Sequence, residues 1–181
     1  MLRRNLYFAP KSVKTKAYTS CVLPILEYAS NSWQPTTESS DNALEMVQHN
    51  AARFISNTYS KKGDFKQVSI TKILNDLQME TLKERRTKAR LSMAYKILNG
   101  HVILESNLLP KVRIKPTQRK CNAPNVGIKN ELVEPSARLQ ATEKTFFYSI
   151  QKIWNQRVSP AQANAPSVEA FRGHFKKNPV Q

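Results

Sequence analysis

The sequence predicts an all-α protein: a small helical bundle, then a basic linker that contains prolines, then two C-terminal helices. Apolar residues recur at spacings of three and four in several separate stretches, which is the pattern of one face of an α-helix. Hydrophobic residues make up 40% of the 181 positions, which is enough to bury a core. The middle of the chain lacks this periodicity. We therefore predict a helical bundle over residues 1–103, a linker over 104–140 and a helical segment over 141–181.

The first predicted helix spans residues 12–33, and it contains an unusual proline. Pro24 lies near its middle, where the ring removes one backbone donor and is expected to kink the helix. Pro35 ends the element, and Ser40 or Asp41 can cap the next helix by accepting free backbone amides. That second helix carries an apolar stripe made of Leu44, Val47, Ala51, Phe54 and Ile55.

Two further helices complete the predicted bundle. Ser69 can cap a short third helix, whose shared apolar face consists of Ile70, Ile73, Leu74 and Leu77. Thr81 and Glu84 have the spacing of a capping box, in which each side chain accepts a backbone amide of the other residue. They open a long fourth helix. Asn99 and Gly100 supply a left-handed stop at its end.

The middle and the end of the chain differ in character. Four prolines fall among cations between residues 109 and 138, so we predict a basic linker there. Val112 and Ile114 alternate with cations, which leaves a short edge strand open as an alternative. A fifth helix, with Thr142 as its expected cap, carries Phe146, Phe147, Ile150, Ile153 and Trp154, and a sixth carries Ser167, Val168, Phe171 and Phe175.

The charge balance points to an anionic partner. The chain has 29 Lys and Arg against 13 Asp and Glu, so its formal net charge is +16. In a compact fold these positive charges repel one another unless a polyanion offsets them. No run reaches the roughly 18 apolar residues of a membrane span, and we expect no membrane partner. We also expect no secretion signal and reduced thiols at Cys21 and Cys121. These features favour an intracellular protein and do not distinguish nucleus from cytoplasm.

Catalytic groups are not apparent in the sequence. A template-copying polymerase holds two metal ions on converging carboxylates, but Asp41, Asp64 and Asp76 do not form the required adjacent pair. The chain has four Gly and no Gly-rich phosphate loop, and its three histidines are isolated. We therefore expect no metal, no cofactor and no catalysis from this chain alone.

Nucleic-acid binding has better support. The predicted fourth helix places Lys83, Arg86 and Arg90 on one stripe, and Arg85 and Lys88 flank it. In the linker, Lys111 and Arg113 lead a further run of cations that has no acid, so we expect non-specific contacts with an RNA or DNA backbone. The alternative is an ordinary solvated helix face. Tyr7, Phe8 and Tyr95 are candidates for stacking on bases, although an aromatic residue next to apolar helix residues more often belongs to the core. Trp33 and Trp154 are expected in the core.

Several segments, taken together and in order, resemble the region after the catalytic palm in reverse transcriptases of jockey-like LINE retrotransposons. They are residues 22–29 (VLPILEYA), 51–54 (AARF), 84–91 with 95–97, and towards the end 154–155 and 165–171. The likeness covers roughly Leu2 to His101 well, and the tail departs from it at residues 156–160. It implies thumb-like helices that grip template and primer.

The same resemblance implies a non-catalytic piece of an RNA-directed DNA polymerase, whose endonuclease and palm would lie upstream. A missing palm domain is then a second expected partner. Two alternatives remain open. The chain could be a structural remnant whose apolar helix faces once packed on that palm, or it could restore polymerase activity when added to a separate palm subunit.

Overall fold

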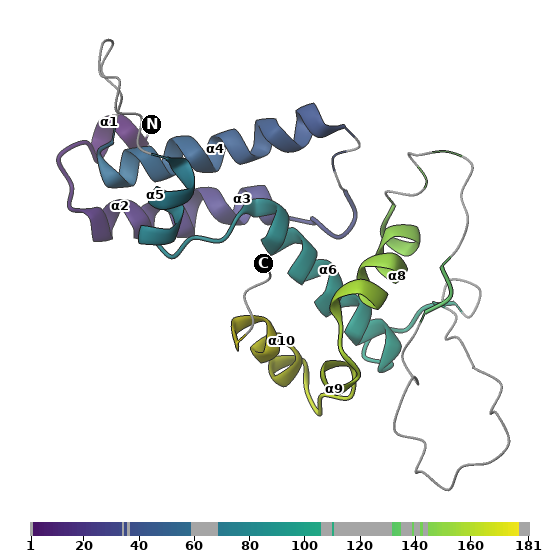
Figure 1. Ribbon diagram of the computed structural model, residues 1–181. Helices are drawn as coiled ribbons and strands as arrows, with labels where there is room; N and C mark the ends of the chain where they lie inside the picture. Colours follow the sequence, from purple (N-terminus) through teal and green to yellow (C-terminus); the bar gives the residue numbers. More distant parts are fainter. Residues whose placement is uncertain are drawn as a thin grey trace, which may run out of the picture. The chain divides into compact units, whose positions relative to one another are not determined.

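The computed structural model describes residues 2–33, 35, 37–58, 69–105, 110, 132–134, 139, 142 and 145–177. The described part is mostly helical and contains no β-strand, which confirms the all-α prediction (Figure 1). The chain forms two compact units. We call them the N-terminal unit, Met1–Ser30 with Pro35–Arg86, and the C-terminal unit, Asn31–Gln34 with Thr87–Gln181. Their boundary falls within one helix, between Arg86 and Thr87, and not near residue 103.

The first predicted helix is built from three consecutive pieces. After the short α1 (Leu2–Asn5), α2 (Lys11–Ala17) passes through a π-helical turn (Tyr18–Val22) into α3 (Leu23–Glu27). The Leu23 amide donates to the Tyr18 carbonyl, five residues earlier. In a regular α-helix the ring of Pro24 would clash with the carbonyl four residues before it, and a π-turn at this point changes that hydrogen-bond ladder. The helix then ends at Glu27, earlier than predicted.

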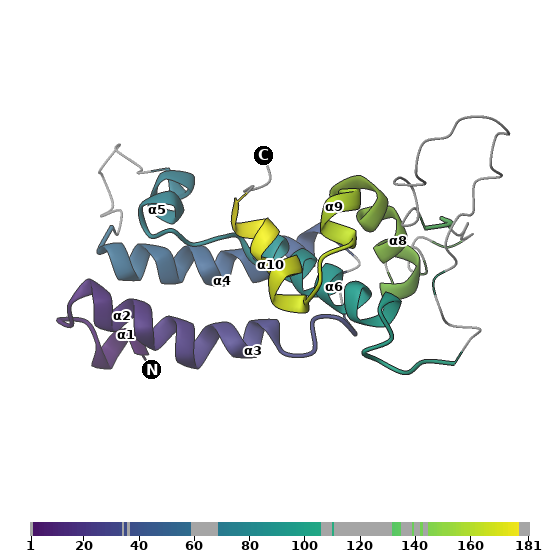
Figure 2. The same ribbon diagram turned by 90° about the horizontal axis from the view of Figure 1, so that it is seen from below.

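Helix α4 (Glu38–Ser56) runs alongside α2 and α3 in the N-terminal unit (Figures 1 and 2). Its cap is Thr37, whose hydroxyl accepts from the Ser40 amide at 3.3 Å, so the predicted caps Ser40 and Asp41 lie inside the helix. Ile55 packs with Tyr18, Leu23 and Leu82 in one apolar cluster. Leu44 and Ala51 pack against the same cluster, but Val47 of the predicted stripe is 41% exposed.

Two helices follow α4: the first belongs to the N-terminal unit, and the second begins in that unit and continues into the C-terminal unit. Helix α5 (Ile70–Asp76) buries Ile73 and Leu74 against Ala52 of α4. At the start of helix α6 (Leu82–Leu98) the Thr81 hydroxyl accepts from the Glu84 amide at 3.2 Å, which is one of the two hydrogen bonds of the predicted capping box.

A second, unforeseen cap comes from α4. The carboxylate of Glu45 accepts from the amides of Leu82, at 3.3 Å, and Lys83, at 2.7 Å. A negative charge at a helix N-terminus is also favoured by the helix dipole. The far end of α6 is confirmed as predicted: Gly100 takes a left-handed conformation, with φ of 70°, immediately after the helix.

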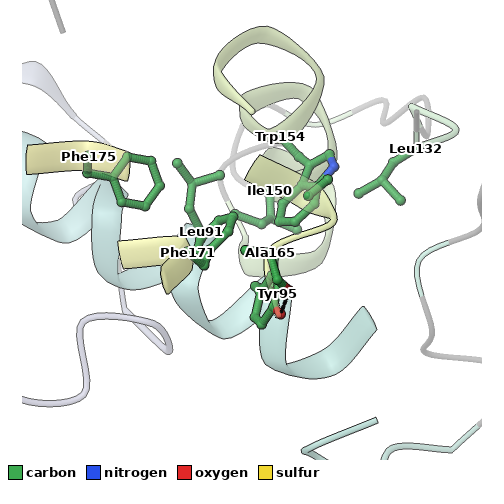
Figure 3. Close-up of a cluster of buried hydrophobic side chains, with 10 residues drawn as sticks. Leu91, Tyr95, Leu132, Ile150, Trp154, Ala165, Phe171 and Phe175 are labelled. Atoms are coloured by element: carbon green, nitrogen blue, oxygen red, sulfur yellow. Dashed lines mark hydrogen bonds between the residues drawn. The ribbon is translucent and has the colours of Figure 1, made fainter. Parts of the chain in front are cut away.

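The C-terminal unit has an aromatic core. It is formed by the second half of α6 with α8 (Phe146–Arg157), α9 (Pro160–Ala163) and α10 (Val168–Lys177). The ring of Phe171 lies 4.6 Å from that of Tyr95 and 5.8 Å from that of Trp154, measured between centroids (Figure 3). The Tyr95 hydroxyl donates to the Ala165 carbonyl at 2.5 Å. These contacts place the C-terminal helices in one unit with Leu91–Tyr95, although the sequence assigned the two to separate domains.

A segment from the predicted linker also enters this core. Leu132 is fully buried, and both its backbone amide and its carbonyl are bonded to the Asn155 side chain, at 2.8 and 2.9 Å. The rest of the predicted linker, including Val112 and Ile114, lies almost entirely outside the described residues.

Other local predictions require correction. The N-cap residue of α8 is Thr145 and not the predicted Thr142. The Thr145 side chain accepts no backbone amide of the helix. Ser159 and Gln162 form a capping box on α9, a helix that the periodicity did not indicate. Trp154 is buried as predicted, but Trp33 is 36% exposed. Cys21 is exposed, and Cys121 lies outside the described residues.

Candidate nucleic-acid interface

Five of the seven cations predicted to contact a nucleic-acid backbone lie on α6, and they differ in accessibility. Lys83 is exposed, Arg85 and Lys88 are half-buried, and Arg86 and Arg90 are buried. Lys111 and Arg113 fall outside the described residues. The single cationic stripe that helical spacing predicts is therefore interrupted at two of its three positions.

Arg86 is held inside the N-terminal unit. Its Nη2 donates to Asp41 Oδ1 at 2.5 Å, and the arginine side chain is only 6% exposed. Because Asp41 lies in the first turn of α4, this ion pair joins the start of α4 to α6. A guanidinium enclosed in this way does not present its donors to an external phosphate, so the prediction for Arg86 is corrected.

Arg90 is used inside the C-terminal unit in a similar way. Its Nη2 donates to the Ser149 hydroxyl at 2.5 Å, and its guanidinium carbon lies 5.4 Å from the centroid of the Phe146 ring. Burial lowers the pKa of Arg90 to about 10, because the charged form loses its hydration. The ring face of Phe146 and the hydroxyl offset part of that loss. The prediction that Arg90 contacts phosphates is corrected for the same reason as that for Arg86.

Arg85 is more accessible but locally compensated. Its guanidinium forms an ion pair with Glu27 at the end of α3, and the arginine side chain is 37% exposed. The hydrogen bond that Arg85 donates to the Glu27 carboxylate raises the pKa of Arg85, and desolvation acts in the opposite direction. A partly exposed pair of this kind is weak and screened by salt. Arg85 therefore keeps part of its guanidinium on the surface while it is paired with Glu27.

The remaining accessible cations are distributed over both units. On α6 they are Lys83 and Lys88. Elsewhere in the described residues, the exposed basic side chains are Arg3, Arg4, Lys11, Lys16, Lys72, Lys152, Arg157 and Arg172. Charge dispersed in this manner suits a polyanionic backbone, which presents a phosphate at every nucleotide. It does not suit a single compact anion, which needs several donors converging on one point.

Within the ranges that the structure describes, no three His, Cys, Asp or Glu side chains are grouped so that they could hold a metal ion. No helix there is long and apolar enough to cross a bilayer. Comparison of the chain with known proteins found no matching protein-family model, no matching curated protein and no matching solved structure.

Proposed function

We propose that this chain binds the sugar-phosphate backbone of RNA or DNA without sequence preference and without catalysing a reaction. Its role is then that of the helical region that follows the palm in a LINE-type reverse transcriptase. The observation that carries the proposal is the net charge of +16 together with basic side chains that remain on the surface after folding. Such an excess attracts phosphate groups and releases their counterions.

The ion pairs of Arg85 and Arg86 leave this excess intact. Each one joins a single arginine to a single carboxylate, Arg85 to Glu27 and Arg86 to Asp41, so neither changes the net charge. Of the cations that we predicted on α6, Lys83 is exposed and Arg85 and Lys88 are half-buried. We propose these three residues as phosphate contacts, with Lys111 and Arg113 as further predicted contacts.

Replacing both Lys83 and Lys88 by alanine is expected to reduce the salt dependence of binding. Each lost phosphate contact lowers the slope of log affinity against log salt by about 0.9 on duplex DNA or about 0.7 on a single strand. The measurement is the anisotropy of a labelled oligonucleotide titrated at several salt concentrations. The control is the double lysine-to-arginine variant, which keeps both charges and should keep the slope. An unchanged slope in the alanine variant would remove these two residues from the interface.

A second candidate function is supported by two exposed apolar residues, one on α3 and one directly after its end. Ile25 is 74% exposed and Tyr28 is 79% exposed, and both belong to the segment that carries the resemblance to the LINE proteins. Neighbouring exposed apolar residues often mark a surface that another domain covers. On this alternative the chain is an interaction remnant that packed on a palm domain and binds no nucleic acid.

Dye binding distinguishes the two candidates. If the remnant interpretation holds, the purified chain binds a hydrophobic fluorescent dye, and changing Ile25 and Tyr28 together to serine reduces that signal. The same protein would fail to shift a labelled oligonucleotide at low salt. A clear shift at low salt, with little dye binding, would reject the remnant interpretation. The matched control is Val47→Ser, which changes an exposed apolar residue on α4.

A further inference from the structure

The first part of the N-terminal unit is unusually basic. No Asp or Glu occurs before Glu27, whereas the same stretch contains Arg3, Arg4, Lys11, Lys14 and Lys16. Lys14 turns inward: it is 1% exposed, and its amine donates to Asn57 Oδ1 at 2.6 Å and lies 4.8 Å from the centroid of the Phe54 ring. The other four cations are exposed. The segment therefore carries a local excess of positive charge.

Two exposed aromatic side chains lie between these cations in the sequence. Tyr7 is 55% exposed and Phe8 is 95% exposed, and their rings meet edge to face with centroids 5.0 Å apart. Both lie in the turn that joins α1 to α2 (Figure 1). The turn is fixed by backbone bonds from the Leu6 amide to the Leu2 carbonyl, at 2.9 Å, and from the Ala9 amide to the Leu6 carbonyl, at 3.1 Å. The aromatic pair is thus held out from the surface by an ordered turn.

We propose that this segment is a binding site for single-stranded nucleic acid. Bases stack on the ring of Phe8, and on that of Tyr7 beside it, while phosphates are attracted by Arg3, Arg4, Lys11 and Lys16. Exposed aromatic rings combined with a basic surface are the common composition of single-strand sites. The inference rests on the proposed function, and it adds a location and a preferred form of the ligand.

The preference for a single strand follows from the chemistry of the two kinds of residue. In a duplex each base is already stacked on its neighbours, so a protein ring gains contact only with bases that are free to leave the stack. The cations interact with the phosphates of either form. Removing the rings should therefore weaken binding to a single strand selectively, whereas removing cations should weaken both.

The test compares the full-length wild type with Phe8→Ala, measured by anisotropy on a labelled single strand and on the corresponding duplex at the same salt concentration. Loss of one stacked base should lower single-strand affinity roughly 5- to 140-fold and leave duplex affinity and the salt slope unchanged. Phe8→Trp preserves a stacking face and should retain single-strand affinity. Because Phe8 is 95% exposed, circular dichroism should show the alanine variant folded.

The possible outcomes separate this inference from the proposed function. If the wild type binds both ligands with a clear salt slope but Phe8→Ala binds the single strand equally well, only the stacking site is rejected. Equal losses on single strand and duplex would also reject it. If the wild type binds neither ligand at low salt, the proposed function fails and this site fails with it.

Discussion

Replacing Phe171 by alanine is expected to lower the free energy of unfolding of the C-terminal unit by about 3–5 kcal/mol. Phe171 is fully buried on α10 and lies at the centre of the aromatic core (Figure 3). Its ring contacts those of Tyr95, Trp154 and Phe175, the last at 5.2 Å between centroids. Truncation removes these contacts and leaves a cavity bounded by rigid rings, which cannot collapse freely.

Urea unfolding followed by circular dichroism gives the overall effect, and hydrogen exchange measured on peptides assigns it to a unit. Protection should fall most in α8 and α10. The matched control is Phe8→Ala, the same chemical change at a side chain that is 95% exposed, where the loss should stay within about 0.5 kcal/mol. If the two variants had similar midpoints, the aromatic core described here would be contradicted.

Replacing Asp41 by alanine is the second change with a large expected effect. The carboxylate is the partner of Arg86, whose side chain is 6% exposed, and removing it leaves a buried positive charge without this counter-ion. Breaking a buried pair by removing one member costs about 3–5 kcal/mol, and partial exposure of Asp41 at 23% favours the lower end of that range. The measurement is the urea midpoint of the N-terminal unit, followed by hydrogen exchange of α4.

Two further variants separate the ion pair from other effects. Glu38 also lies in the first turn of α4 and is exposed, so Glu38→Ala removes only a dipole interaction of about 0.3–1 kcal/mol. Adding Arg86→Met to Asp41→Ala removes the buried charge and should restore part of the lost stability. Equal effects of Asp41→Ala and Glu38→Ala would show that the pair with Arg86 is not important for folding.

The helices were predictable because periodicity of apolar residues is a local property. Residues such as Ile55, Leu74 and Trp154 take the buried positions that their spacing predicted. Helix starts were less predictable, since Thr37, Ser40 and Asp41 are all good caps and only the fold selects Thr37. Glu45 caps α6 by accepting from the amides of Leu82 and Lys83, which follow it in the sequence by 37 and 38 positions. No local sequence pattern could reveal a contact over that separation.

The candidate site was predicted less well, and the reason is geometric. Arg86 follows Leu82 by four residues, and Arg90 precedes Ala94 by four, so both arginines share a helix face with fully buried apolar residues. That spacing indicates burial, whereas a run of cations is typical of a solvated surface, and the two patterns conflict at these positions. The exposure of Phe8 was equally hard to predict, because an aromatic residue in an apolar context is more often buried than exposed.

Backbone binding is tested by the affinity of the purified 181-residue chain for a labelled oligonucleotide, measured from low to moderate salt. We expect clear binding at low salt for unrelated sequences, with log affinity falling linearly against log salt by about 0.7–0.9 for each phosphate contacted. Absence of binding at low salt, or an affinity that does not change with salt, would contradict the claim that exposed cations of this helical chain bind a nucleic-acid backbone.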